Sequence, residues 1–518
     1  MVGISVLDPS APFSPTSRPR KPYRFLMITV ISALGCLILG LFFLISRQKQ
    51  DPSNPRKLPL PPGPKPDPLI GNVRHMPLDL PWVRFAEWRK IYGDMIHMKL
   101  LGDHILILNS YKSCMDLLGQ KVIYASRPKF LLAKYMGMGE LTTVQPYGDT
   151  FRRHRRLLHS ALSKSAVAQF QPAQEAQTKW FLSTLTHDTK NCIANLRLLT
   201  GRTIVQATYG IEVKSVDDDY IVLAEEFIRS GAILLSPATN LWDAFPIFPY
   251  LPSWFPGAGI KQIAHQTRQI IDQMVKTSMG HVKAELATGE AARSLAANAL
   301  ESGDYAEEDI KWASAILYFA GADTTYGVLA AFIFFMIKHP EIQKKAQAEV
   351  DRVVGRGRMP TFEDRQQLPY IDCIIKEIIR WSAIAPAALP HCLTEDDYYN
   401  GYWIPAGTTV VANTWAISRD ETLYKDPERF SPERFEGEAG KDAVDPFTFA
   451  LGFGRRICPG LHFVNSMAFI VIASILAGYE ISKPRDENGQ EVEPRESYTP
   501  GAIRVFEHFD CTIKPRSA

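Results

Sequence analysis

The chain has 518 residues, 46% hydrophobic and 22% charged, so it is long enough to bury a large core and is not disordered. Its formal net charge of +3 is too balanced to indicate nucleic-acid binding, and no nucleic-acid motif is present. The cysteine count is odd, 7, and no two are spaced as C-x-x-C, which argues against a disulfide framework and a four-cysteine zinc site.

The N-terminal region predicts a membrane anchor. Residues 25–45 form an uncharged apolar run, and about 20 such residues are enough for a helix to cross a bilayer. A cleaved signal peptide is the alternative, but the run is too long, starts too far along the chain and lacks a small-residue cleavage site. Basic residues flank both ends, so charge does not fix the orientation. We expect a tail over 1–24 and a single-pass anchor over 25–45.

A proline-rich segment follows the predicted anchor. Its prolines cannot continue a helix, and such a segment is stiff and extended. It predicts a linker over 46–68 between the anchor and a catalytic domain over 69–518.

The catalytic region predicts a helix-rich α+β fold with small sheets near both ends. Two apolar runs over 94–110 surround Gly102-Asp103, and Asn400-Gly401 lies in a second such pattern; both are typical of β-hairpins. Between them, periodic apolar residues predict helices over 340–354 and 368–384, each bounded by a proline or glycine.

One loop, FALGFGRRICPGLHF, carries a single cysteine in a glycine-rich, basic setting. A thiolate is a strong metal ligand, and the charge of Arg455 and Arg456 and the N-terminus of the following apolar helix would favour it. Gly454 and Gly460 lack a Cβ, so the backbone could approach a flat group. A lone cysteine thiolate suits haem iron. Three alternatives remain for Cys458: an inert buried thiol, a nucleophile, or a metal site shared with His462.

Three other sequence patterns contain polar residues that have either a structural or a functional explanation. Glu377 and Arg380 are spaced for an ion pair on one helix face, with a solvated surface pair as the alternative. Asp323 and Thr324 interrupt a long apolar helix just after Gly321, and a back-bonded threonine beside a satisfied aspartate is the alternative to a functional role. A basic run over 152–156 is either a solvated face or a functional surface.

Together these motifs resemble the cytochrome P-450 family, whose haem-binding signature is Phe-x-x-Gly-x-Arg-x-Cys-x-Gly. Gly454, Arg456, Cys458 and Gly460 match it, whereas Leu451 stands where the family usually has phenylalanine. The resemblance implies a mainly α fold, a large helical domain with small sheets, and Cys458 as the axial ligand of haem b.

The resemblance also implies roles for the other motifs. Residues 320–324 match Ala-Gly-x-Asp-Thr, so Asp323 and Thr324 would deliver protons to bound dioxygen. Glu377 and Arg380 match Glu-x-x-Arg, which would join Arg434 in a buried structural lock.

The resemblance further implies three partners for the haem propionates: Arg155, His391 and Arg456. Arg155 matches the arginine of Trp-x-x-x-Arg, but Phe151 replaces the tryptophan and has no N–H to donate. The remaining arginines of the basic run would form part of a positive surface for an acidic electron donor.

The implied activity is that of a haem-thiolate monooxygenase that oxidises a hydrophobic small molecule with O2. Electrons from NADPH would arrive through a separate NADPH-cytochrome P-450 reductase, with the enzyme anchored in the endoplasmic reticulum and its catalytic domain in the cytosol. The sequence resembles enzymes of fungal secondary metabolism, which favours a terpenoid or polyketide substrate. The alternatives are an O2-independent isomerase or dehydratase and a non-catalytic membrane haem-binding protein. By family analogy, four largely apolar segments would line the pocket: 130–144, 314–318, 384–389 and 498–503.

Overall fold

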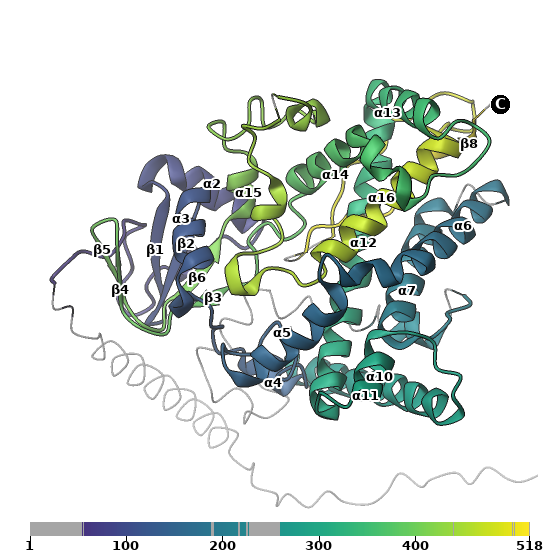
Figure 1. Ribbon diagram of the computed structural model, residues 1–518. Helices are drawn as coiled ribbons and strands as arrows, with labels where there is room; N and C mark the ends of the chain where they lie inside the picture. Colours follow the sequence, from purple (N-terminus) through teal and green to yellow (C-terminus); the bar gives the residue numbers. More distant parts are fainter. Residues whose placement is uncertain are drawn as a thin grey trace, which may run out of the picture. The chain divides into compact units, whose positions relative to one another are not determined.

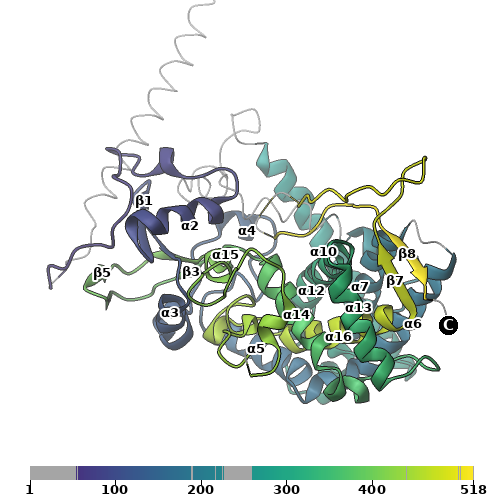
Figure 2. The same ribbon diagram turned by 90° about the horizontal axis from the view of Figure 1, so that it is seen from above.

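The computed structural model describes residues 54, 56–187, 191–215, 218–223, 226, 259–438, 440–499, 501 and 503–516. The predicted tail and anchor lie outside the described residues. Helices make up most of the folded unit, and three small sheets accompany them, as the sequence predicts (Figures 1 and 2).

The largest sheet joins two distant parts of the chain, in the order β1-β2-β6-β3. β1 (Met95–Leu100) and β2 (Asp103–Leu108) form the first predicted hairpin, but its turn is Leu101-Gly102, one residue earlier than expected. Both turn residues have positive φ, 49° and 97°, as a two-residue hairpin of this kind requires. β6 (Thr409–Ala412) then pairs with β2 in parallel, and β3 (His391–Cys392) pairs with β6.

Two further sheets are single antiparallel pairs. β4 (Asp397–Tyr399) and β5 (Tyr402–Ile404) form the second predicted hairpin, with Asn400-Gly401 as its turn. β7 (Tyr479–Ser482) pairs with β8 (Thr512–Pro515) at the end of the chain.

Part of the proline-rich segment packs on the sheets, so it is not a free spacer there. The carbonyl of Pro62 accepts a hydrogen bond from the His97 N–H at 2.8 Å, and the carbonyl of Pro59 accepts one from Trp403 at 2.9 Å. A Cβ on Gly63 would lie 1.9 Å from the His97 carbonyl oxygen, so only glycine fits this approach.

The helices form the larger part of the unit. Their bounds are α2 (Pro81–Tyr92), α3 (Tyr111–Cys114), α4 (Leu131–Tyr135), α5 (Asp149–Leu162), α6 (Gln171–His187), α7 (Cys192–Tyr209), α10 (Ile260–Thr288), α11 (Leu295–Ser302), α12 (Glu307–Lys338), α13 (Pro340–Val353), α14 (Pro369–Ser382), α15 (Thr414–Ser418) and α16 (Leu461–Gly478). Three short turns matter below: η2 (Met115–Gln120), η8 (Pro432–Phe435) and η10 (Gly454–Arg456). The two predicted helices correspond to α13 and α14.

Helix α12 is the centre of the helical part. It packs against α5, α7, α14 and α16 and contributes to two hydrophobic clusters, one with α10 and α11 and one with α13 and α16. α12 and α16 are apolar on all sides and long enough to cross a membrane, but both are mostly buried among other helices. Their composition therefore reflects their place in the core.

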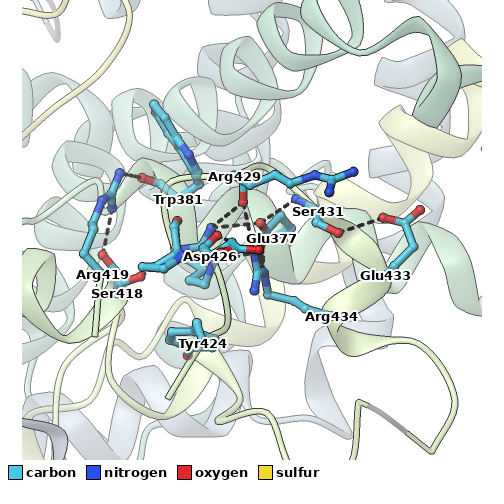
Figure 3. A network of polar contacts seen from close by, with 12 residues as sticks. Glu377, Trp381, Ser418, Arg419, Tyr424, Asp426, Arg429, Ser431, Glu433 and Arg434 are labelled. Carbon is cyan, nitrogen blue, oxygen red and sulfur yellow. Dashed lines mark hydrogen bonds and ion pairs between the residues drawn. The ribbon is translucent and has the colours of Figure 1, made fainter. Parts of the chain in front are cut away.

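A buried ion-pair network holds α14 to the segment before the cysteine loop. Glu377 and Arg380 have fully buried side chains, and Arg380 binds both carboxylate oxygens of Glu377 at 2.7 and 2.8 Å. Arg434 on η8 donates to the same carboxylate at 3.1 Å, and the Ser431 N–H adds a bond at 2.8 Å (Figure 3). The structure thus brings Glu377, Arg380 and Arg434 together, and the pair is not a solvated surface pair.

Replacing Glu377 with glutamine should strongly destabilise the protein. The change leaves two guanidinium groups buried beside a neutral amide, and breaking a buried pair by removing one partner costs about 3–5 kcal/mol. We expect the midpoint of urea unfolding, followed by circular dichroism, to fall markedly. Glu438→Gln is the control, because Glu438 forms an exposed pair with Lys441. Equal effects of the two substitutions would contradict a structural role for Glu377.

Candidate functional site

Cys458 lies in the loop between η10 and α16. Its N–H donates to the Leu451 carbonyl at 2.7 Å, and its side chain is half-buried. Burial raises the pKa of the Cys458 thiol, while the N–H groups of Gly460 and Leu461 and the guanidinium of Arg155 oppose that rise. Arg155 on α5 is the guanidinium that acts on this thiol, and in the polypeptide alone burial outweighs it. The part expected of Arg455 and Arg456 stays a prediction.

The two signature glycines do different work. Gly454 has φ of +50°, and a Cβ there would lie 2.6 Å from the carbonyl oxygens of Leu118 and Gly119 in η2. It is needed so that the loop can approach η2, and the expectation that it also makes room for a cofactor stays a prediction. At Gly460 a Cβ would lie 3.7 Å from the Cys458 sulfur, so glycine keeps the space beside the thiol open.

Buried cationic side chains gather next to this loop. Arg456 donates to the carbonyls of Ala125, Thr142 and Gln145 at 2.6, 3.3 and 2.7 Å. Arg127 donates to the carbonyl of Thr143 at 2.9 Å and to those of Leu389 and Pro390 at 2.8 and 2.7 Å. These two arginines therefore anchor the segments before α5 and before β3.

His391 and Arg155 complete the group. His391 Nδ1 bonds the Tyr124 carbonyl at 2.8 Å, and Arg155 donates to the Ile457 carbonyl at 2.8 Å, one residue before Cys458. We call Arg127, Arg155, His391 and Arg456 the cationic cluster. The structure brings the three predicted propionate partners, His391, Arg155 and Arg456, into the region of the cysteine loop.

The cationic cluster has no carboxylate among its hydrogen-bond partners in the described part of the chain. Those partners are carbonyl oxygens, and the acidic groups that act on Arg155 and Arg456 are the Cys458 thiol and the Tyr147 hydroxyl. Burial lowers the pKa of Arg127 to about 9, of Arg456 to about 10 and of His391 to about 3. With this pKa His391 is neutral at neutral pH, so the buried charge of the cluster lies on its arginines. Buried charges of one sign are costly unless paired, so these guanidinium groups fit a bound group that carries carboxylates. The two propionates of haem b meet that requirement.

The aromatic ring of Phe151 contacts the cationic cluster. The Arg456 guanidinium lies 3.7 Å from the centre of the Phe151 ring, within cation–π range. Phe151 is buried, 4% exposed, so this contact is desolvated. A ring that stacks on Arg456 stands where the family has a tryptophan, although it provides no N–H.

The middle of α12 differs from the rest of the helix. Ala320 is exposed and Gly321–Thr324 are half-buried, whereas the flanking turns are buried. A Cβ on Gly321 would lie 2.5 Å from the Ile204 side chain of α7, so glycine permits this close helix packing. Solvent can therefore reach one stretch of a helix that is otherwise buried.

The predicted proton-relay residues have local partners. The Thr324 hydroxyl donates to the Ala320 carbonyl at 2.7 Å, one helical turn earlier. Asp323 lies 3.4 Å from Arg197 on α7. Both contacts are those expected for the alternative, a back-bonded threonine beside a satisfied aspartate. Both residues lie on the part of α12 that is less buried than the turns around it.

Two charged residues of this region were missed at the sequence level. Arg127 lies in the sequence YASRP, where the only signal is its position before a proline. Arg197 lies on α7 without any motif, and its guanidinium is 4.4 Å from the Tyr326 ring as well as close to Asp323. Only the tertiary fold brings either residue to the site.

Comparison with known proteins gives a matching family model and several similar proteins. The family model for cytochrome P-450 matches residues 61–501. The monooxygenase COX2 of Coprinopsis cinerea is 40% identical over 88% of this chain and 89% of its own length. The monooxygenase claR of Ampulloclitocybe clavipes is 36% identical over 89% of this chain and 88% of its own length.

A solved structure shares the fold. A zebrafish cytochrome P-450 determined with abiraterone has a TM-score of 0.67 at 22% identity, covering 84% of this chain and 100% of its own. Proteins of this family bind haem through a cysteine thiolate. The match over most of the chain, and the extent of identity to fungal enzymes, show that this chain belongs to the cytochrome P-450 family and is a monooxygenase.

Proposed function

We propose that the chain is a membrane-anchored haem-thiolate monooxygenase in which Cys458 binds the haem iron. The observation that carries this proposal is the cationic cluster beside the Cys458 loop, which needs carboxylates from outside the chain. Arg155, His391 and Arg456 would hold the propionates, with Arg127 adding positive charge. Bound haem supplies the activation of dioxygen and the transfer of one oxygen atom to the substrate.

The proposed part of Asp323 and Thr324 is to hold and deliver protons. The Thr324 hydroxyl can turn from the Ala320 carbonyl toward the accessible side, and the Asp323 carboxylate, 3.4 Å from Arg197, is the neighbouring group that could pass a proton to it. An apolar wall alone cannot supply protons. This pair also favours oxygen activation over an O2-independent isomerase or dehydratase, and over a non-catalytic haem-binding protein.

Electrons are proposed to come from NADPH through NADPH-cytochrome P-450 reductase. Arg152 and Arg156 of α5 have exposed side chains near the loop that carries Cys458. A positive surface of this kind attracts an acidic protein partner. The proposed location is the endoplasmic reticulum, with the anchor over 25–45 and the catalytic domain in the cytosol.

The proposed substrate is a hydrophobic small molecule of fungal secondary metabolism, a terpenoid or polyketide. One of the four segments predicted to line the pocket, Ser314–Tyr318, belongs to α12, and another, 384–389, begins beside that helix at Ile384. A Cβ on Gly327 would lie 3.5 Å from Ile384 and 2.7 Å from Val505, which is two residues beyond the segment 498–503. The segment 384–389 is largely half-exposed and apolar, whereas Ser314–Tyr318 is buried in the core. The relatives named above are fungal monooxygenases, which agrees with this class.

Reduced protein treated with carbon monoxide should absorb near 450 nm, which is about the wavelength typical of thiolate-bound haem. Cys458→Ala should abolish that band while the chain stays folded by circular dichroism. Cys392→Ala is the control, because Cys392 is also half-buried but lies on β3. Loss of the band in both variants, or its persistence in Cys458→Ala, would rule out Cys458 as the ligand.

Deletion of the gene in the native host, followed by comparison of metabolites, should identify the substrate. We expect an apolar precursor to accumulate and an oxygenated derivative to disappear. The purified enzyme with reductase and NADPH should convert that precursor. Accumulation of an isomer or dehydration substrate, with no oxygen gained, would favour the isomerase or dehydratase instead.

Thr324→Ala should uncouple electron use from oxidation of that substrate. Without the hydroxyl, proton delivery fails, and general acid–base groups typically contribute a factor of about 100 or more. We expect NADPH consumption to continue while product falls and hydrogen peroxide rises. Thr325→Ala is the matched control, since its hydroxyl is back-bonded to Gly321 at 2.6 Å in the same way but its side chain is buried. Unchanged coupling in Thr324→Ala would remove Thr324 from the relay.

A further inference from the structure

A buried histidine on α5 has no part in the roles above. His154 is 1% exposed, and each of its ring nitrogens has a partner. Nε2 lies 3.2 Å from Oδ1 of Asp309 in the first turn of α12, and Nδ1 lies 3.0 Å from the hydroxyl of Thr142. One imidazole therefore connects α5, the start of α12 and the loop before α5.

The partners fix the direction of these hydrogen bonds. Burial lowers the pKa of His154, so the ring is neutral at neutral pH; the charged groups facing it are Asp309, Arg153 and Glu140. The Asp309 carboxylate also accepts from Arg153 at 2.7 Å, and in this ion pair its oxygens act as acceptors, so the ring proton lies on Nε2. Nδ1 then accepts a bond from the Thr142 hydroxyl.

Thr142 is also a partner of the cationic cluster. Its carbonyl accepts from Arg456, as the Gln145 carbonyl does, and the intervening Thr143 carbonyl accepts from Arg127. Residues 142–145 contain neither helix nor strand. Their backbone is held by these contacts and by a turn in which the N–H groups of Val144 and Gln145 donate to the Leu141 carbonyl at 3.0 and 3.2 Å; we call Thr142–Gln145 the carbonyl segment. His154 holds this segment through the hydroxyl of Thr142, and Arg456 holds it through the carbonyl of the same residue.

The two partners of the His154 ring, Asp309 and Thr142, differ in their access to water. A cleft of about 380 Å³ is lined by His154, Asp309, Arg153 and Trp312, so water can reach the Asp309 end. Thr142 is 5% exposed and does not line the cleft. Water can replace a lost partner at the cleft end, whereas loss of the bond to Thr142 leaves buried polar groups unsatisfied.

We propose that His154 is a positioning residue for the cofactor: with Asp309 and Thr142, it holds the carbonyl segment and so fixes the direction in which Arg456 presents its guanidinium to the haem propionates. The inference rests on the proposed role of Arg456. It assigns His154 no contact with haem or substrate and no proton to transfer. Its effect should therefore appear in how tightly haem is held, with or without a substrate.

The test compares variants that keep one contact each. The side-chain amide of asparagine reaches the place of Nδ1, where its oxygen can accept from the Thr142 hydroxyl, and the amide nitrogen of glutamine occupies the place of Nε2, where it can donate to Asp309. His154→Asn therefore keeps a partner for Thr142, and His154→Gln keeps one for Asp309. Thr142→Val removes the hydroxyl and retains the carbonyl. His159→Asn is the control, because His159 is exposed on the same helix. The holoproteins are mixed with excess apomyoglobin, and the rate of haem transfer and the ferric reduction potential are measured.

We expect His154→Gln and Thr142→Val to release haem about tenfold faster, since an outer partner of a bound group usually contributes this much. Their reduction potentials should shift in the same direction. His154→Asn and His159→Asn should stay close to the unsubstituted protein. The double variant His154→Gln with Thr142→Val should resemble either single variant, because both remove one contact.

Two outcomes would overturn the inference. Release at the control rate in His154→Gln and Thr142→Val, even with a lower unfolding midpoint, would make the contact a support of the fold alone. Additive effects in the double variant would show that the two residues act separately. If His154→Gln does not fold, Thr142→Val is used for the test, because valine has nearly the same shape as threonine.

Arg456→Lys separates failure of this inference from failure of the proposed function. If haem transfer is unchanged in Arg456→Lys, the proposed propionate role of Arg456 is wrong. If Arg456→Lys accelerates transfer and the His154 and Thr142 variants do not, only the positioning role of His154 is wrong.

Discussion

The cost of burying positive charge organises this protein around two groups of arginines. In the first group, Arg380 and Arg434 share the carboxylate of Glu377, so the chain itself supplies a counter-charge to them. In the second, Arg127 and Arg456 sit among carbonyl oxygens, which satisfy their N–H groups but not their charge. The first group closes the fold behind the cysteine loop. The second leaves a requirement for an anion, and that requirement is where the cofactor belongs.

Helix α12 connects these charges to the reaction. Because it is apolar on all sides, it can pass through the core and contact helices in both large hydrophobic clusters. Its accessible stretch, Ala320–Thr324, is where polar side chains and a glycine interrupt that pattern. The first turn of the same helix carries Asp309, which reaches the carbonyl segment through His154. Helix α12 therefore extends from Asp309, which reaches the carbonyl segment through His154, to Asp323 and Thr324, which are proposed to deliver protons.

The sequence predicted what depends on local pattern. The hairpin at Asn400-Gly401 and the bounds of α13 and α14 follow from turn chemistry, prolines and glycines. The Leu101-Gly102 turn was misplaced by one residue, because leucine at positive φ gives no sequence signal. The joining of β2 to β6 and the packing of Pro62 beside His97 involve residues far apart in sequence, so no periodicity could indicate them.

The residues of the candidate site also fall into those that the sequence indicated and those that only the fold shows. Cys458, Glu377 and Asp323 were found because each breaks a pattern or matches a motif. Arg127, His154 and Arg197 were missed as site residues because their importance comes from what the fold places beside them. Gly454 gains a second reason in the structure: the motif indicates that a glycine is required, but only the fold shows that the loop approaches η2 at this residue.

The depressed pKa values of the cationic cluster have a consequence for folding. A basic group whose pKa is lower in the folded than in the unfolded chain binds its proton more weakly when folded, so at neutral pH its charge opposes folding. Arg127 and Arg456 are both in this position. An anion held only by the folded chain offsets that opposition and stabilises the fold by mass action. The proposed haem site would therefore couple haem binding to folding through the same guanidinium groups, and the positioning role proposed for His154 would act on both.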